Sequence, residues 1–285
     1  MLTPTQICFF HTFGYLHVPG YFQEEIAWII DEYEAIWAAH PELPHDGSVR
    51  TTLPGLFVGA SKRLATVIEH PKVIAVCTAL LGAGYGLQGG DGNRYCGDTE
   101  YHSDTGGPDW ENKTVARHLK IAFYLDHLTR DSGALRVIPG THLHGDQYAR
   151  EIERQLTTPW QERALQVSGR DIPAVAVESA PGDLVCFDHR IKHAAFGGGT
   201  RRRMFTTNWI QGATTPAMRE AVLANYRGYR DGMNVNWRIT EDWMVEAPAA
   251  RLPMLAQMKE FGEIVMAEKD AAEAAAHGQL LAGAR

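Results

Sequence analysis

The chain is poor in cysteine, has no long apolar run and carries no excess of positive charge. Its four cysteines lie far apart, at Cys8, Cys77, Cys96 and Cys186, and never form a CxxC pair. This spacing argues against a disulfide framework or a thiolate metal site, and it fits the reducing cytoplasm. The formal net charge of −7 argues against nucleic acid as the main partner.

The sequence also contains no signal for membrane insertion or for secretion. No apolar stretch approaches the roughly 20 residues that a membrane-spanning helix needs. The first ten residues, MLTPTQICFF, lack the basic segment and the apolar run of a signal peptide. We find no internal repeat. We therefore expect a cytoplasmic protein with no membrane partner.

The pattern of apolar and turn-forming residues divides the 285 residues into three zones of one domain, 1–285. Residues 1–82 read mostly as helix, with apolar residues at helical spacing between acidic ones. Over about 84–212, short β-type runs alternate with clusters of Gly, Pro, Asp and Asn, a pattern typical of a sandwich or barrel. Residues 213–285 return to helix and end in an alanine-rich tail. The sequence predicts a mainly β fold with flanking helices.

A histidine and a carboxylate lie two residues apart in the segment EYHSDTGGPDW. On a strand, His102 and Asp104 would point to the same face and could share one metal ion. The sequence contains two further His-x-acid pairs, but His40 and Glu42 follow a helix end, and His144 and Asp146 enter a loop. The alternative for His102 and Asp104 is a hydrogen-bonded surface pair.

A third ligand is expected from the segment APGDLVCFDHRIKHAAFGGGTRRRMFTTNW, where His193 lies at a strand end. Two histidines and one carboxylate are the typical ligand set of non-haem Fe(II). Three arginines, 201–203, then lead into the next strand. Such a triplet is ordinarily a solvated turn, but a fixed guanidinium can also bind the carboxylate of a co-substrate in bidentate fashion.

Four motifs in this order resemble the phytanoyl-CoA dioxygenase-like branch of the Fe(II)/2-oxoglutarate-dependent oxygenases. They are YHSD, FYLDHLTRDSGALRVIPGTH, APGDLVCFDHRIKH and the arginine that comes after them. The resemblance includes FFHTFGYLHVPGYF near the start and covers roughly residues 6 to 212. It implies a double-stranded β-helix core, of the jelly-roll or cupin-like kind. It also implies Fe(II), 2-oxoglutarate and O2 as cofactors, with ascorbate as an aid in vitro.

The resemblance assigns roles residue by residue. His102, Asp104 and His193 would be the metal triad, and Arg202 would bind the distal carboxylate of 2-oxoglutarate, with Arg203 as the runner-up. Strand alternation places two more side chains on the inward face with Arg202, namely Thr206 and Asn208. The remaining residues expected to line the co-substrate pocket are Lys120, Ala122, Gln88 and Asn93. One departure is Ala195, where the family usually has a hydroxyl residue; Thr206 or a water would replace it.

The implied activity is hydroxylation or a related oxidation of a small metabolite or natural-product intermediate, giving succinate and CO2. Halogenating relatives lack the carboxylate that Asp104 supplies here. Candidate substrate contacts are Trp110, Arg117 and His118, although each could be an ordinary exposed loop residue. We expect a monomer or homodimer. The alternatives are a non-catalytic cupin-like metal- or ligand-binding protein and a Mn or Zn hydrolase, neither of which needs the arginine.

Overall fold

The computed structural model describes residues 1–53, 55–104, 116–143, 145–157, 166–200, 202–232 and 247–283. Its strands form two antiparallel sheets. The larger has the order β1-β9-β6-β11-β4-β2, with β3 beside β11, and the smaller has the order β5-β10-β7-β8. The strands of the larger sheet are β1 Tyr15–Val18, β2 Thr51–Leu53, β3 Gly86–Gly89, β4 Gly92–Tyr95, β6 His118–Tyr124, β9 Leu184–Asp188 and β11 Arg202–Ile210. Those of the smaller sheet are β5 Thr99–His102, β7 Leu135–Ile138, β8 Val175–Val177 and β10 Lys192–Ala195.

From β5 to β11 the chain passes back and forth between the two sheets, as a double-stranded β-helix requires. The predicted fold class, mainly β with flanking helices, is therefore confirmed. The β-structure is not confined to residues 84–212, however. Two strands from the N-terminal zone extend the larger sheet: β1 pairs with β9, and β2 pairs with β4.

The N-terminal helices begin and end where local signals place them. Helix α1, Pro4–Phe13, has a capping box between Thr3 and Gln6, and it stops at Gly14, whose φ of 83° suits a residue without a side chain. Helices α2 and α3 span Ile26–Ala38 and Pro71–Leu81. The short segments η1 Phe57–Ala60 and η2 Leu64–Glu69 are 3-10 rather than α-helical.

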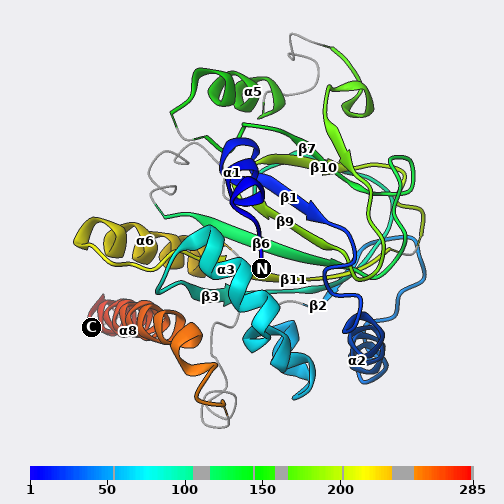
Figure 1. Ribbon diagram of the computed structural model, residues 1–285. Coiled ribbons are helices and arrows are strands. Elements are labelled where there is room, and N and C mark those ends of the chain that lie inside the picture. The colour runs from blue at the N-terminus through cyan, green and yellow to red at the C-terminus, as the bar shows by residue number, and fades with distance from the viewer. Residues whose placement is uncertain are drawn as a thin grey trace.

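The helices cover the larger sheet on its outer face. Apolar side chains from α2, α3, α6 and α8 share one buried cluster with this face, in which the rings of Phe123 and Phe205 stack at 4.5 Å. Helices α6, Pro216–Gly232, and α8, Leu252–Gly283, lie side by side next to β3 (Figure 1). Helix α5, Gln147–Thr157, lies on the opposite side near the smaller sheet and was not expected.

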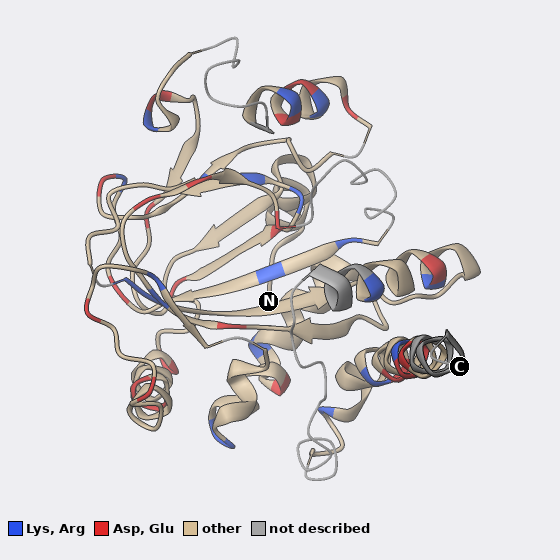
Figure 2. Ribbon diagram, turned by 180° about the vertical axis from the view of Figure 1, so that it is seen from behind, with Lys and Arg blue, Asp and Glu red and all other residues tan. Residues whose placement is uncertain are grey.

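Charged residues gather on the helices and loops, while the strands are mostly uncharged (Figure 2). Within the described ranges, no helix is both long and apolar enough to cross a membrane.

The side chains of the central strands alternate between the helix-covered face and the interior between the sheets. Phe123, Cys186 and Phe205 belong to the outer cluster, whereas Ala122 and Met204 belong to a second cluster that also contains Tyr124, Val185 and Phe187. Even-numbered positions of β6 and β11, and odd-numbered positions of β9, therefore face the interior. This is the alternation predicted for β11 from the sequence.

Candidate active site

The three predicted metal ligands meet between the sheets. Strand β10 pairs with β5 so that His193 lies opposite His102, with 4.3 Å between ring centroids. Asp104 lies just beyond the end of β5 rather than in it, and its backbone N–H donates to the carbonyl of His189 at 2.9 Å. One ligand atom from each of the three side chains lies within 4.8 Å of the other two, a spacing that suits a single ion.

Backbone hydrogen bonds orient both imidazole rings. Nδ1 of His102 donates to the carbonyl of Glu100 at 2.8 Å, and Nδ1 of His193 donates to that of Ile191 at 3.0 Å. A carbonyl can only accept, so each neutral ring carries its proton on Nδ1 and leaves the Nε2 lone pair free. The Nε2 atoms lie 3.9 and 3.7 Å from the carboxylate of Asp104. The donor set therefore fits a divalent metal ion.

The protonation states also suit a metal. Burial lowers the pKa of His193 to about 3, although Asp104 opposes this, so the ring is neutral at pH 7. Burial alone would raise the pKa of Asp104, but Lys120 and His193 outweigh it and hold this pKa well below its ordinary value. The site therefore presents a neutral imidazole and an anionic carboxylate.

Lys120 forms an ion pair with Asp104 in the interior. Its Nζ lies 2.8 Å from Oδ2 and 5.7 Å from the centroid of the Phe187 ring. Burial alone would lower the pKa of Lys120. The negative charge of Asp104 outweighs this effect, so the pKa lies above its ordinary value and the ammonium stays charged. The sequence predicted Lys120 as a pocket residue; the structure places it directly against the carboxylate.

Arg202 carries a buried positive charge. It is 4% exposed, donates from Nη1 to the carbonyl of Gly133, and lies 4.6 Å from the centroid of the Tyr95 ring. Its Nε has no hydrogen-bond partner. Among the residues that the structure describes, no carboxylate pairs with Arg202. Such a group needs an anion to offset its desolvation.

A second guanidinium, that of Arg50, approaches the same ring, at 4.3 Å from its centroid. Asn93 holds Arg50 in place, because Oδ1 of Asn93 accepts from Nη2 and Nε at 2.6 and 2.9 Å. Asp91 lies 3.3 Å from Nη2. Asn93, predicted as a co-substrate contact, uses its amide for Arg50. No sequence signal points to Arg50, which precedes a three-residue strand.

Arg203 lies on the other face of β11. Its guanidinium pairs with Asp126 at 2.7 Å and with Glu34 at 2.8 Å. Both carboxylates come from outside the interior of the sheets. Since this side chain already has two anionic partners, it offers no free cation to a co-substrate.

The remaining predicted residues are distributed around the interior. The Thr206 hydroxyl donates to Asp91. Gln88 donates to Asn225 of α6 and is therefore drawn toward that helix. Arg117 is exposed, whereas His118 is 2% exposed. Trp110 lies outside the described residues, as do His144 and Arg201 of the sequence motifs.

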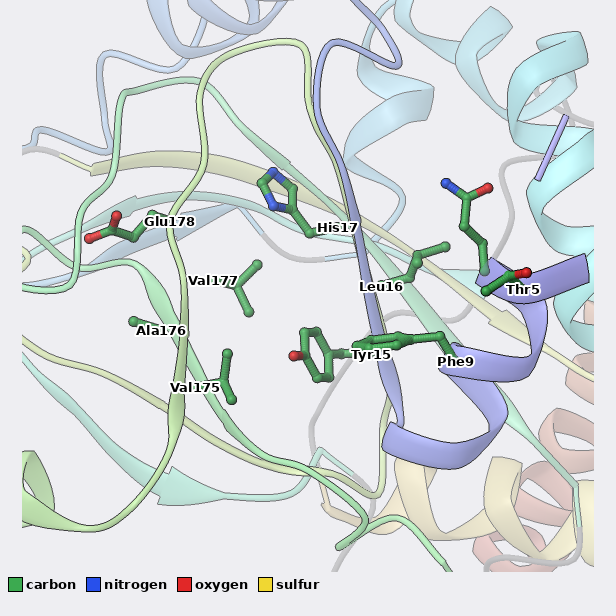
Figure 3. Close-up of a pocket in the computed structure, with 10 residues that line it drawn as sticks. Thr5, Phe9, Tyr15, Leu16, His17, Val175, Ala176, Val177 and Glu178 are labelled. Atoms are coloured by element: carbon green, nitrogen blue, oxygen red, sulfur yellow. The ribbon is translucent and has the colours of Figure 1, made fainter. Parts of the chain in front are cut away.

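A cavity of about 470 Å³ lies away from these residues, where edge strands β1 and β8 of the two sheets face each other beneath α1 (Figure 3). Phe9, Tyr15 and Val175 contribute apolar surface to it, and His17 and Glu178 contribute polar groups. None of the predicted site residues lines it.

Comparison with known proteins agrees with this architecture. A family model described as phytanoyl-CoA dioxygenase (PhyH) matches residues 10–204. None of the curated proteins matches the sequence.

Several solved structures share the fold at low sequence identity. The non-haem alpha-ketoglutarate-dependent epimerase SnoN from nogalamycin biosynthesis is 21% identical, with a TM-score of 0.54 over 74% of this chain and 83% of its own. The carbocyclase SnoK of the same biosynthesis is 20% identical, with a TM-score of 0.54 over 74% and 85%. HygX from Streptomyces hygroscopicus, with nickel and 2-oxoglutarate bound, is 17% identical, with a TM-score of 0.58 over 75% and 88%.

Proposed function

This chain belongs to the phytanoyl-CoA dioxygenase family, and from that premise we propose that it is an Fe(II)- and 2-oxoglutarate-dependent oxygenase that acts on a small molecule. Nε2 of His102, Nε2 of His193 and the carboxylate of Asp104 would hold the iron. When bound, Fe(II) supplies the oxidation chemistry with 2-oxoglutarate and dioxygen, which yields succinate and CO2. Two similar structures support the cofactors, since SnoN contains Fe3+ and alpha ketoglutarate and HygX contains nickel and 2-oxoglutarate.

The observation that carries the proposal is buried Arg202, which lies on the same interior surface as the triad and has no carboxylate partner in the described part of the chain. Its planar guanidinium can bind a carboxylate through two parallel hydrogen bonds. Arg50 approaches the same Tyr95 ring, although Asp91 at 3.3 Å already balances its charge. A non-catalytic cupin-like protein has no use for a buried cation of this kind. We assign the distal carboxylate of 2-oxoglutarate to Arg202 and not to Arg203.

The reaction that we favour is hydroxylation of an unactivated C–H bond. Asp104 keeps its carboxylate, so no ligand position is opened for a halide at this residue. SnoN is an epimerase and SnoK a carbocyclase, which makes epimerisation or ring formation the second candidate on this fold. All of these outcomes share the oxidation of 2-oxoglutarate and differ only in the later fate of the substrate.

The direct test is turnover of 2-oxoglutarate by the purified protein with Fe(II), dioxygen and ascorbate. We expect succinate and CO2 in equal amounts, slowly without substrate. His102→Ala should abolish the reaction, whereas His40→Ala, at an exposed His-x-acid pair outside the site, should leave it unchanged. A wild-type protein that binds Fe(II) and 2-oxoglutarate but never forms succinate would contradict the proposal.

A further inference from the structure

Two buried histidines and a half-buried asparagine beside the metal triad have polar atoms without a well-formed hydrogen bond. His118 and His189 are 2% and 1% exposed. Within the described residues neither nitrogen of the His118 ring has a hydrogen-bond partner, and the His189 ring has only a poorly formed contact with the side chain of Asn208. Oδ1 of Asn208 is also shielded from solvent and makes no well-formed hydrogen bond. Buried polar groups in folded proteins are nearly always hydrogen-bonded, so such a concentration calls for a ligand.

The strand register brings these three residues to one place. His118 precedes Lys120 by two residues on β6, His189 follows Phe187 by two, and Asn208 follows Thr206 by two. His118 and Asn208 therefore belong to the inward-facing rows of β6 and β11, and His189 lies one residue past the end of β9, next to the inward-facing Phe187 row. The strands are neighbours in the order β9-β6-β11.

Direct contacts agree with the register. The His189 N–H donates to the His118 carbonyl at 3.3 Å, and the two rings lie 5.4 Å apart. Asn208 is opposite Lys120 in the sheet. The group thus lies one step beyond the Lys120–Asp104 pair, whereas Arg202 lies at the far end of β11. A substrate and the distal carboxylate of 2-oxoglutarate would occupy opposite ends of the same interior surface.

The charges around the group are already matched. Asp104 pairs with Lys120, and Asp188 pairs with Arg190 at 2.6 Å. Burial lowers the pKa of His118 to about 3, so this ring is neutral at pH 7. A neutral imidazole has one donor and one acceptor, and Oδ1 of Asn208 adds an acceptor. Among the side chains that the structure describes, an ion would find no free counter-charge here, and an apolar chain would leave the His118 ring without a hydrogen bond.

We propose that His118, His189 and Asn208 form a substrate subsite that binds a neutral, hydroxyl-rich part of the substrate, such as a sugar or cyclitol ring. Hydroxyl groups both donate and accept, which is the combination that these side chains require. This inference rests on the proposed function, because the subsite has its use beside a loaded metal centre. It deepens that function by naming the class of substrate.

The test uses the protein loaded anaerobically with Fe(II) and 2-oxoglutarate, and a panel of cyclitols and methyl hexopyranosides, each with a deoxygenated counterpart. Binding is monitored by ligand-detected NMR. We expect wild-type protein to bind at least one polyol more tightly than its counterpart. His118→Leu and His189→Leu should each weaken that binding about tenfold, the effect of losing one well-placed hydrogen bond. His40→Ala should bind like wild type.

Thermal unfolding without polyol separates a binding role from a structural one. If these rings form their hydrogen bonds only with a bound ligand, His118→Leu should keep or raise the melting temperature of the free protein and should weaken polyol binding. A lower melting temperature with unchanged polyol binding would overturn the proposal. So would a wild-type protein that binds no polyol in preference to its counterpart, or a crystal structure with polyol present in which only ordered water occupies the subsite. Failure to load Fe(II) or 2-oxoglutarate at all would instead contradict the proposed function itself, and the subsite with it.

Discussion

At the scale of single residues, His102 and His193 owe their usefulness to backbone carbonyls that fix their Nδ1 protons. A histidine held this way needs no rearrangement to bind a metal through Nε2. The spacing of His102 and Asp104 left two alternatives open, a metal site and a surface hydrogen-bonded pair, and the metal site was favoured by the context of His193 and by the family resemblance. The orientation of the rings was not predictable, because it depends on carbonyls that only the folded strands bring near.

His102→Ala removes one of three ligands. We expect Fe(II) affinity to fall by more than the roughly 10- to 100-fold that is typical of residues that only support a ligand. Calorimetric titration of the metal-free protein measures this. His40→Ala is the matched control. His40 lies 2.7 Å from Glu42 in a similar local pair, but among the described residues this pair has no third side chain with which to hold a metal ion. Equal affinities for the two variants would remove the assignment of the triad.

Lys120 competes with the metal for Asp104. Its ammonium occupies Oδ2 at 2.8 Å, so an arriving divalent cation must share the carboxylate and meet a like charge. We expect Lys120→Met to bind Fe(II) or Ni(II) about tenfold more tightly at pH 8, in the absence of 2-oxoglutarate. Lys72→Met is the control, because Lys72 pairs with Glu25 in the N-terminal helical region. Weaker metal binding by Lys120→Met would show that Lys120 supports the site rather than competes for it.

At the scale of elements, strand alternation carried most of the correct prediction. The nine residues of β11 form a long regular strand, so the inward positions of Arg202, Thr206 and Asn208 could be derived from a period of two. Arg50 could not be found this way, since its position depends on Asn93, forty-three residues away. Helix α5 was not predicted from the sequence, because its residues, QYAREIERQLT, include few apolar ones. Asp104 was placed on a strand that in fact ends at His102.

The junction of α1 and β1 depends on Gly14. A Cβ there would lie 2.5 Å from Nδ1 of His142, and its φ of +83° disfavours any side chain. Gly20 has a φ of +65°, and an added Cβ there would meet no neighbouring atom. A substitution at Gly20 therefore measures the cost of the backbone conformation without a steric clash. We expect Gly20→Ala to lower the free energy of unfolding by about 1 kcal/mol and Gly14→Ala by clearly more. Urea unfolding of both variants measures the difference, and equal losses would mean that His142 moves aside freely.

At the scale of the whole molecule, buried histidines make the stability depend on pH. Burial lowers the pKa of His118 and of His193 to about 3 and that of His189 to about 4, against about 6.5 in the unfolded chain. Between about pH 4 and 6.5 the unfolded state therefore binds more protons than the folded state. Stability is fully present above this window and falls as the pH drops through it.

Each such histidine contributes a slope of up to about 1.4 kcal/mol per pH unit in that window. We expect the metal-free protein to unfold at lower urea concentration at pH 5.0 than at pH 7.5. His118→Leu should reduce the difference, because one proton-binding group is gone from the unfolded state. Identical urea midpoints at the two pH values for the wild-type protein would show that these rings are not buried as neutral groups.

The central claim, that this fold holds Fe(II) and 2-oxoglutarate together, is tested most directly by calorimetric titration of the anaerobic Fe(II) protein with 2-oxoglutarate. We expect one 2-oxoglutarate per chain, bound only when metal is present. We also expect Arg202→Lys to lose about 2–5 kcal/mol of binding free energy, or tens- to thousands-fold in affinity, because lysine lacks the planar fork. Arg203→Ala should bind normally, since that side chain serves Asp126 and Glu34. If 2-oxoglutarate showed no metal-dependent binding, or if its affinity fell in Arg203→Ala and not in Arg202→Lys, this chain would not hold Fe(II) and 2-oxoglutarate in the way described.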